Sequence, residues 1–215
     1  MSRASLSELQ QVIHTVGDIL TEQARRQPEA RALVFQKRET TFAELEQRSN
    51  QVANKLRSLR MPVQSRVAVM IRNSDDFFPI LFGVAKAGMV LVTINFRLTA
   101  PEMSYILESD ARILFTESAY EDQAETCRSQ LSALEHIVVM TEGADESGLS
   151  TWLGSASGTK PSLDVQPEHT AIQMYTSGTT GAPKGVELTH RCMVVAAEEG
   201  LTLWTAMFKE NSAVL

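Results

Sequence analysis

Four short apolar runs recur at a nearly constant spacing along this chain, and they limit the fold more than any other feature. The runs begin about 23 residues apart, near Val67, Val90, Ile113 and Ile137. Helices are expected between them, at 75–87, 101–109 and 119–134. Strands that are rich in β-branched residues along their whole length are typical of a sheet that is covered on both faces. The alternation therefore predicts an α/β fold, with a largely parallel sheet flanked by helices.

The N-terminal residues predict a helix, a hairpin and a second helix. Apolar positions at helical spacing mark a helix over 16–27. A strand at 32–35 and a polar turn at 36–38 indicate a small hairpin. Thr41 and Glu44 have the spacing of a capping box, so the second helix should begin there.

A boundary is expected where the composition changes. Residues 141–166 are rich in Gly, Ser, Thr and Pro, as connections between structural units are. We therefore expect an N-terminal α/β subdomain over 1–165 and the start of a second subdomain over 166–215.

Charge and cysteine content narrow the class of protein. The 215 residues carry a net charge of -6 and are 43% hydrophobic, as in an ordinary globular protein. An acidic chain has no electrostatic reason to bind nucleic acid, so none is expected as a partner. Cys127 and Cys192 fit neither a metal-binding spacing nor a disulfide framework, which predicts reduced thiols in a cytoplasmic protein.

Neither a secretory signal nor a membrane span is expected. The first eleven residues contain no apolar core of the kind that signal peptides carry. Residues 77–94 are apolar except for Lys86, but Pro79, Gly83 and Gly88 interrupt them. This stretch is expected to form a buried helix followed by a buried strand.

The stretch from Tyr175 to Gly185 has the composition of a phosphate-binding loop. Glycines allow the backbone to bring its N–H groups close to an anion, hydroxyls add donors, and one lysine adds a positive charge. The candidate ligands of a phosphate chain are Thr176, Ser177, Gly178, Thr179, Thr180, Gly181 and Lys184. Apolar segments at 171–175 and 186–188 predict a strand on each side of the loop.

Two other interpretations of this stretch are weaker. The P-loop motif of kinases and GTPases requires a second glycine where this chain has Pro183, and a Ser or Thr where it has Gly185. A flexible linker would also be rich in Gly, Ser and Thr, but apolar segments on both sides argue against it.

After the loop, Thr189 is expected to cap a helix that runs to about Phe208 and whose N-terminus points back toward the phosphate site. His190, in the first turn of that helix, is expected to be a polar surface residue. Tyr175 and Trp204 are expected to pack rather than to contact a substrate. The remaining histidines and Cys192 have no sequence partners that indicate metal binding or catalysis.

The string YTSGTTGAPKGVELTH, from Tyr175 to His190, resembles the nucleotide-binding signature of the adenylate-forming superfamily. This superfamily includes acyl-CoA synthetases, aryl-CoA ligases, luciferases and the adenylation domains of peptide synthetases. The resemblance extends upstream through 41–45, 65–74 and 87–102. It implies the N-terminal portion of the adenylate-forming enzyme fold, truncated after the phosphate loop.

The resemblance also implies a reaction and its participants. A carboxylic acid attacks ATP to give an acyl-adenylate, and coenzyme A then displaces AMP. The loop residues named above would hold the β- and γ-phosphates, with Lys184 and Thr176 as the catalytic pair and Thr176 also reaching Mg²⁺. The run from Asn95 to Leu98 is more similar to fatty-acyl and aryl-CoA synthetases than to peptide synthetases.

The superfamily's later motifs do not occur in residues 1–215, and an apolar run at 212–215 resembles a strand cut short. The chain is therefore expected to be an N-terminal fragment that forms no acyl-adenylate alone and binds ATP feebly. Two alternatives stay open. One is a peptide-synthetase or luciferase-like relative, and the other is a non-catalytic module that binds a partner or forms a homodimer through an unfinished sheet edge.

Overall fold

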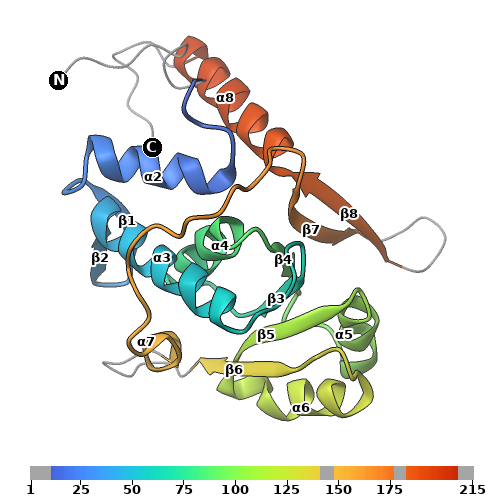
Figure 1. Ribbon diagram of the computed structural model, residues 1–215. Helices are drawn as coiled ribbons and strands as arrows, with labels where there is room; N and C mark the ends of the chain where they lie inside the picture. The colour runs from blue at the N-terminus through green and yellow to red at the C-terminus, as the bar shows by residue number, and fades with distance from the viewer. Residues whose placement is uncertain (1–10, 141–147, 177–182, 208–215) are drawn as a thin grey trace.

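The computed structural model describes residues 11–140, 148–176 and 183–207. Its main feature is a six-stranded sheet in the order β6-β5-β3-β4-β7-β8 (Figure 1). The strands are β3 Arg66–Met70, β4 Val90–Thr93, β5 Ala111–Glu117, β6 His136–Met140, β7 Thr170–Thr176 and β8 Lys184–Thr189. All neighbouring pairs are parallel except β7 and β8, which form an antiparallel hairpin. The predicted α/β fold with a largely parallel sheet is confirmed.

Helices cover both faces of this sheet. On one face lie α2 Val16–Arg26, α3 Phe42–Ser58, α4 Phe77–Lys86 and α7 Gly148–Leu153, and on the other lie α5 Ala100–Leu107 and α6 Glu121–Gln130. The strands supply both cores because successive side chains point to opposite faces. In β3, for example, Val67 and Val69 pack on the α3–α4 side, while Ala68 and Met70 pack on the α5–α6 side.

The N-terminal elements follow their local signals. Strands β1 Arg31–Phe35 and β2 Arg38–Thr41 form the predicted antiparallel hairpin. Thr41 and Glu44 form the predicted capping box at the start of α3, with the Thr41 N–H donating to Glu44 Oε2 at 2.8 Å. Local hydrogen-bond chemistry thus sets the start of α3 independently of the core.

The apolar stretch at 77–94 divides into α4 and β4, as predicted, with both elements in the core. Within the described residues, no helix combines the length and apolarity that a bilayer span requires. The helix predicted at 119–134 is shorter than expected. A 3-10 turn, η1 Ser118–Tyr120, precedes α6, and α6 stops because Leu131 takes an extended conformation.

A long connection returns from α7 to β7 across α3 (Figure 1). The amide of Asn54 donates to the carbonyls of Ser157 and Thr159 at 2.8 and 2.9 Å, and Asn50 donates to the carbonyl of Gly158 at 3.0 Å. Strand β7 then pairs with β4, so the same sheet continues past residue 165. The subdomain boundary expected there stays a prediction.

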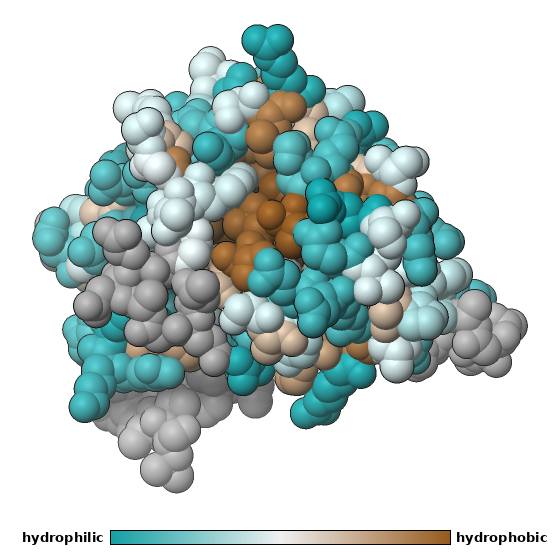
Figure 2. Space-filling view, turned by 90° about the horizontal axis from the view of Figure 1, so that it is seen from below, coloured by the Kyte–Doolittle hydropathy of each residue, from teal (hydrophilic) through white to brown (hydrophobic). Residues whose placement is uncertain are grey.

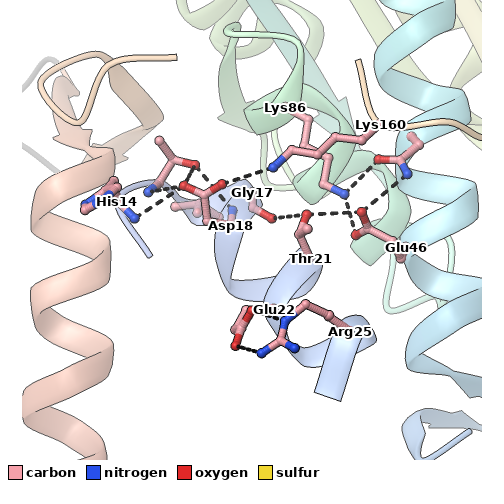
Figure 3. A network of polar contacts seen from close by, with 12 residues as sticks. His14, Gly17, Asp18, Thr21, Glu22, Arg25, Glu46, Lys86 and Lys160 are labelled. Atoms are coloured by element: carbon pink, nitrogen blue, oxygen red, sulfur yellow. Dashed lines mark hydrogen bonds and ion pairs between the residues drawn. The ribbon is translucent and has the colours of Figure 1, made fainter. Parts of the chain in front are cut away.

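A buried ion pair joins α3 and α4 beneath α2 (Figure 3). The ammonium of Lys86 contacts Glu46 and donates to Asn50 Oδ1 at 2.8 Å, and the Lys86 side chain is 2% exposed. Burial lowers the pKa of Lys86, and the negative charge of Glu46 opposes that shift. Thr21 of α2 donates to Glu46 at 3.1 Å, so a single carboxylate links three helices.

The sheet ends at β6 on one side. Ile137 and Val139 of this strand are half-buried, and β6 lies along the lower side of the molecule in Figure 1. Figure 2, viewed from below, shows apolar side chains at the floor of a central hollow that polar side chains border.

Candidate functional site

The β7–β8 hairpin brings the two ends of the predicted phosphate loop together. Thr176 is the last residue of β7, Lys184 is the first of β8, and the two are cross-strand partners. Both residues are exposed. The other candidate ligands, Ser177, Gly178, Thr179, Thr180 and Gly181, lie outside the described residues. The two strands that the sequence predicts on either side of the loop are confirmed.

The hairpin mouth opens at the carboxyl edge of the sheet. Because β7 runs parallel to β4, Thr176 ends on the same edge as Thr93 of β4 and Met70 of β3. Strand β3 has β4 on one side and β5 on the other, so the topological switch point lies between β3 and β5 on this same edge, and β7 is two strands from β3. In open α/β sheets, ligands bind outside the carboxyl ends of strands near such a point.

Lys184 is available to an external anion. The structure shows no hydrogen bond or ion pair to its side chain from the described residues, and β8 is an edge strand. An exposed lysine on an edge strand also discourages pairing with another chain, so exposure alone does not assign a role. Its position opposite Thr176, at the mouth of a loop of hydroxyl and glycine residues, favours anion binding.

The hairpin is closely packed around Tyr175, one residue away from the mouth. Gln173 donates to the Tyr175 hydroxyl at 3.0 Å, and the two rings of Tyr105 and Tyr175 meet edge to face with centroids 6.4 Å apart. Gly185 lies across from Tyr175, where a Cβ would come within 2.8 Å of Gln173 Nε2 and 3.3 Å of Tyr175 Cζ. The prediction that Tyr175 is a packing residue is confirmed.

The following helix begins farther from the phosphate site than the sequence predicts. Helix α8 His190–Met207 begins only after β8 has run the length of the hairpin, and Thr189 pairs with Thr170 at the start of β7 (Figure 1). Its N-terminus is therefore separated from Lys184 by about 17 Å of strand and cannot act on a phosphate there. The predicted cap is present, since Thr189 Oγ1 accepts from the Cys192 N–H at 3.2 Å.

His190 is also not the surface residue that its sequence position predicts. It is completely buried, and its Nδ1 accepts the N–H of Val16, the first residue of α2, at 3.2 Å. Burial lowers the pKa of His190 to about 4, helped by the nearby His169, so the ring is neutral at physiological pH. The histidine ties the starts of two helices together.

Among the described residues, no group of three or more His, Cys, Asp or Glu side chains is placed to bind a metal ion. Cys127 is buried and Cys192 is exposed, and both are free thiols.

A cavity of about 430 Å³ lies between β1 and the loop after β3, with mostly apolar walls. Its charged residues are already used. Asp75 receives two hydrogen bonds from Arg38, at 2.7 and 2.9 Å, and Arg72 pairs with Glu117 at 2.8 Å. The residues that line this cavity connect the β1–β2 hairpin to the loop after β3. Because Asp75 and Arg72 are already paired, neither is free to bind the carboxylate of a substrate.

Comparisons with known proteins agree with the resemblance seen in the sequence. The model of the family described as AMP-binding enzyme matches residues 20–213. The fatty acid–acyl-carrier-protein ligase ScoC of Streptomyces coeruleorubidus is 36% identical over 94% of this chain and 38% of its own length. The long-chain-fatty-acid–CoA ligase FadD13 of Mycobacterium tuberculosis is 34% identical over 85% of this chain and 36% of its own length.

Solved structures give the same result. The anthranilate CoA ligase AuaEII, in complex with anthranoyl-AMP, superposes with a TM-score of 0.80 at 31% identity, over 87% of this chain and 37% of that one. A fatty acyl CoA synthetase of Mycobacterium tuberculosis gives a TM-score of 0.73 at 30% identity. The chain thus spans a little over a third of the length of these relatives. On this sequence and structural similarity, the chain belongs to the AMP-binding enzyme family.

Proposed function

We propose that this chain is the N-terminal part of an ATP-dependent carboxylate–CoA ligase, which activates a fatty acid as an acyl-adenylate and transfers the acyl group to coenzyme A. One observation carries the proposal. Thr176 and Lys184 face each other, exposed and without other described partners, at the mouth of a loop of glycine and hydroxyl residues on the sheet's carboxyl edge.

The reaction requires positive charge and hydrogen-bond donors near the phosphates, and the mouth of the loop offers both. A carboxylate oxygen attacks the α-phosphorus of ATP, the bond between the α- and β-phosphates breaks, and pyrophosphate leaves. Both reactants are anions, so positive charge and hydrogen-bond donors must be in place before the attack. Lys184 supplies a charge and Thr176 a hydroxyl, and both would hold the β- and γ-phosphates together with the loop residues between them.

Mg²⁺ fits this site only in part. Magnesium is usually bound through one or two protein oxygens plus the phosphates of its substrate. Thr176 offers one such oxygen at the loop mouth, and Mg²⁺ would there neutralise charge on the phosphates. The remaining ligands would come from ATP and from residues beyond those described.

Fatty acids are the proposed substrate class because of the named relatives. Two fatty-acid ligases are 34% and 36% identical to this chain, whereas a linear gramicidin synthase of Brevibacillus parabrevis is 29% identical. The run from Asn95 to Leu98 favours a fatty-acyl or aryl-CoA synthetase over a peptide synthetase. The free thiols Cys127 and Cys192 are consistent with a cytoplasmic location, which we also propose.

Substitution of Lys184 in the complete enzyme tests the proposal. Lys184→Ala should lower acid-dependent ATP–pyrophosphate exchange at least ~10-fold, since a charged donor contributes about 2 to 3 kcal/mol. Lys37→Ala, which removes an exposed lysine in the β1–β2 turn, serves as the matched control and should leave the exchange unchanged. Equal rates for the two variants would contradict the proposed role of Lys184.

Two further measurements separate this function from its alternatives. A panel of fatty, aryl and amino acids in the exchange assay identifies the activated class, and activity with amino acids alone would favour a peptide-synthetase relative. The non-catalytic alternative rests on β6 and β8, the two edge strands of the described sheet. Sedimentation of the 215-residue chain would show whether it dimerises, and calorimetry with ATP and Mg²⁺ whether it binds nucleotide.

A further inference from the structure

Tyr105 of helix α5 contacts the end of the candidate phosphate loop. Its hydroxyl donates a hydrogen bond to the carbonyl oxygen of Pro183 at 3.0 Å. Pro183 directly precedes Lys184, and the carbonyl that accepts this bond belongs to the same peptide plane as the Lys184 N–H. Fixing that plane fixes the direction in which the Lys184 backbone, and therefore its side chain, leaves the loop.

The same tyrosine also supports the start of the loop. Its ring meets Tyr175 edge to face at 6.4 Å, and Tyr175 directly precedes Thr176. The Tyr175 hydroxyl in turn lies 3.5 Å from the carbonyl of Ile106, the next residue along α5. Helix α5 therefore reaches the residues that immediately precede Thr176 and Lys184, the two candidate phosphate ligands that the structure describes.

The hairpin is fitted to this contact. Gly185 leaves room for the Tyr175 ring, because a Cβ there would lie 2.8 Å from Gln173 Nε2 and in tight contact with Tyr175 Cζ at 3.3 Å. On the far side of Gln173, Arg66 of β3 donates to its Oε1 at 3.2 Å and to Glu187 of β8 at 2.7 Å. Polar bonds thus link β3, β7 and β8, so the mouth is held from the sheet as well as from α5.

We propose that Tyr105 is a positioning residue of the phosphate loop, whose hydroxyl holds the Pro183 carbonyl so that Lys184 points at the phosphates of ATP. This inference rests on the proposed function. Tyr105 is 43% exposed, so burial does not account for its presence at this place. It acts through Lys184 and need not touch the nucleotide.

The test is Tyr105→Phe in the complete enzyme, which keeps the aromatic contact with Tyr175 and removes only the bond to Pro183. One neutral hydrogen bond corresponds to an increase of about three- to tenfold in the KM for ATP. The thermal midpoint should stay at the wild-type value, because the aromatic contact with Tyr175 is kept. Tyr120→Phe is the matched control, since Tyr120 also packs on an aromatic ring, Phe96, and its hydroxyl has no hydrogen bond among the described residues.

A double-mutant cycle with Lys184→Ala decides whether the effect passes through the lysine. If Tyr105 positions Lys184, adding Tyr105→Phe to Lys184→Ala changes the KM for ATP no further. An unchanged KM in the single variant, or a full additive increase in the double variant, would overturn the proposal. If Lys184→Ala itself has no effect, the proposed function fails. If Lys184→Ala impairs exchange and Tyr105→Phe does not, the positioning role alone fails.

Discussion

Lys86 and Lys184 carry the same functional group and are used in opposite ways. The Lys86 side chain is 2% exposed and is held by Glu46 and Asn50 between two helices. Lys184 is exposed on an edge strand and has no partner among the described residues. The comparison shows that a lysine stabilises this fold when a carboxylate inside the molecule neutralises its charge. A lysine that pairs with no described residue is available to bind an anionic ligand.

Removal of the buried lysine should have the largest effect on stability. Lys86→Met removes the counter-charge of Glu46, whose side chain is 16% exposed and keeps hydrogen bonds from Thr21 and Asn50. This should cost about 3 kcal/mol of unfolding free energy, measured by urea denaturation. Lys160→Met is the control, because Lys160 is 54% exposed and its 3.4 Å contact with Asp18 should contribute under ~1 kcal/mol.

Equal unfolding free energies for Lys86→Met and Lys160→Met would contradict the structural role of Lys86. The double variant Glu46→Leu with Lys86→Met tests whether the loss of stability comes from the charge left on Glu46. With both charges gone, the unfolding free energy should recover part of the loss seen in Lys86→Met, since no unpaired charge is left in the core.

Acid should destabilise the chain through His190, which lies buried at the far end of the hairpin from Lys184. Its pKa is about 4 in the fold, against 6.5 for an unperturbed histidine. Between these values the unfolded state binds more protons, so the stability present above pH 6.5 is lost as pH falls to 4, by about 3 kcal/mol.

The variant His190→Asn isolates this effect from other titrating groups. Asn Oδ1 can still accept the Val16 N–H but does not titrate, so the difference between wild type and variant should vary with pH in the same window. A difference that is constant from pH 4 to 7 would contradict the buried neutral histidine.

A side chain in place of Gly185, next to the mouth of the hairpin, should have an intermediate effect on stability. Gly185→Ala places a methyl group within 2.8 Å of Gln173 Nε2, and such overpacking costs about 1 to 3 kcal/mol. Gly200→Ala in α8 is the control, because a Cβ there meets nothing within 4 Å, and it should stabilise the helix slightly. Thermal unfolding of the two variants in parallel would show whether the support beneath Lys184 is as tight as described.

Substitution of Lys184 is expected to have the smallest effect on stability. Lys184→Met should change the unfolding free energy by less than ~0.5 kcal/mol, because an exposed side chain without partners contributes little to folding. Urea denaturation measures it alongside Lys86→Met. A loss of several kcal/mol would mean that Lys184 is structural, and the functional assignment would lose its main support.

Local signals predicted most of the fold. Capping chemistry at Thr41 and Glu44, the apolar runs of β3 to β6 and the two strands around the phosphate loop all act between near neighbours in sequence. The pairing of Thr176 with Lys184 also follows from two strands joined by a short loop.

Contacts between distant residues could not be predicted in this way. Val16 and His190 are 174 positions apart, and nothing near His190 signals burial. Likewise, the sequence places His190 just after the loop, whereas the antiparallel course of β8 carries it to the opposite edge of the sheet. Tyr105 was missed because a tyrosine in an apolar helix has the pattern of an ordinary core residue.

The connection that crosses α3 has a consequence for how this protein can evolve. Asn50 and Asn54 bind three successive main-chain oxygens, at Ser157, Gly158 and Thr159, and every amino acid carries that oxygen. Substitutions at Ser157 and Thr159 therefore keep the bonds from the two asparagines and lose only the local bonds that these two residues make with each other. Gly158 is the exception, since a side chain there would strike Gln47. Sequence drift should thus be tolerated in the connection and resisted in the two asparagines that hold it.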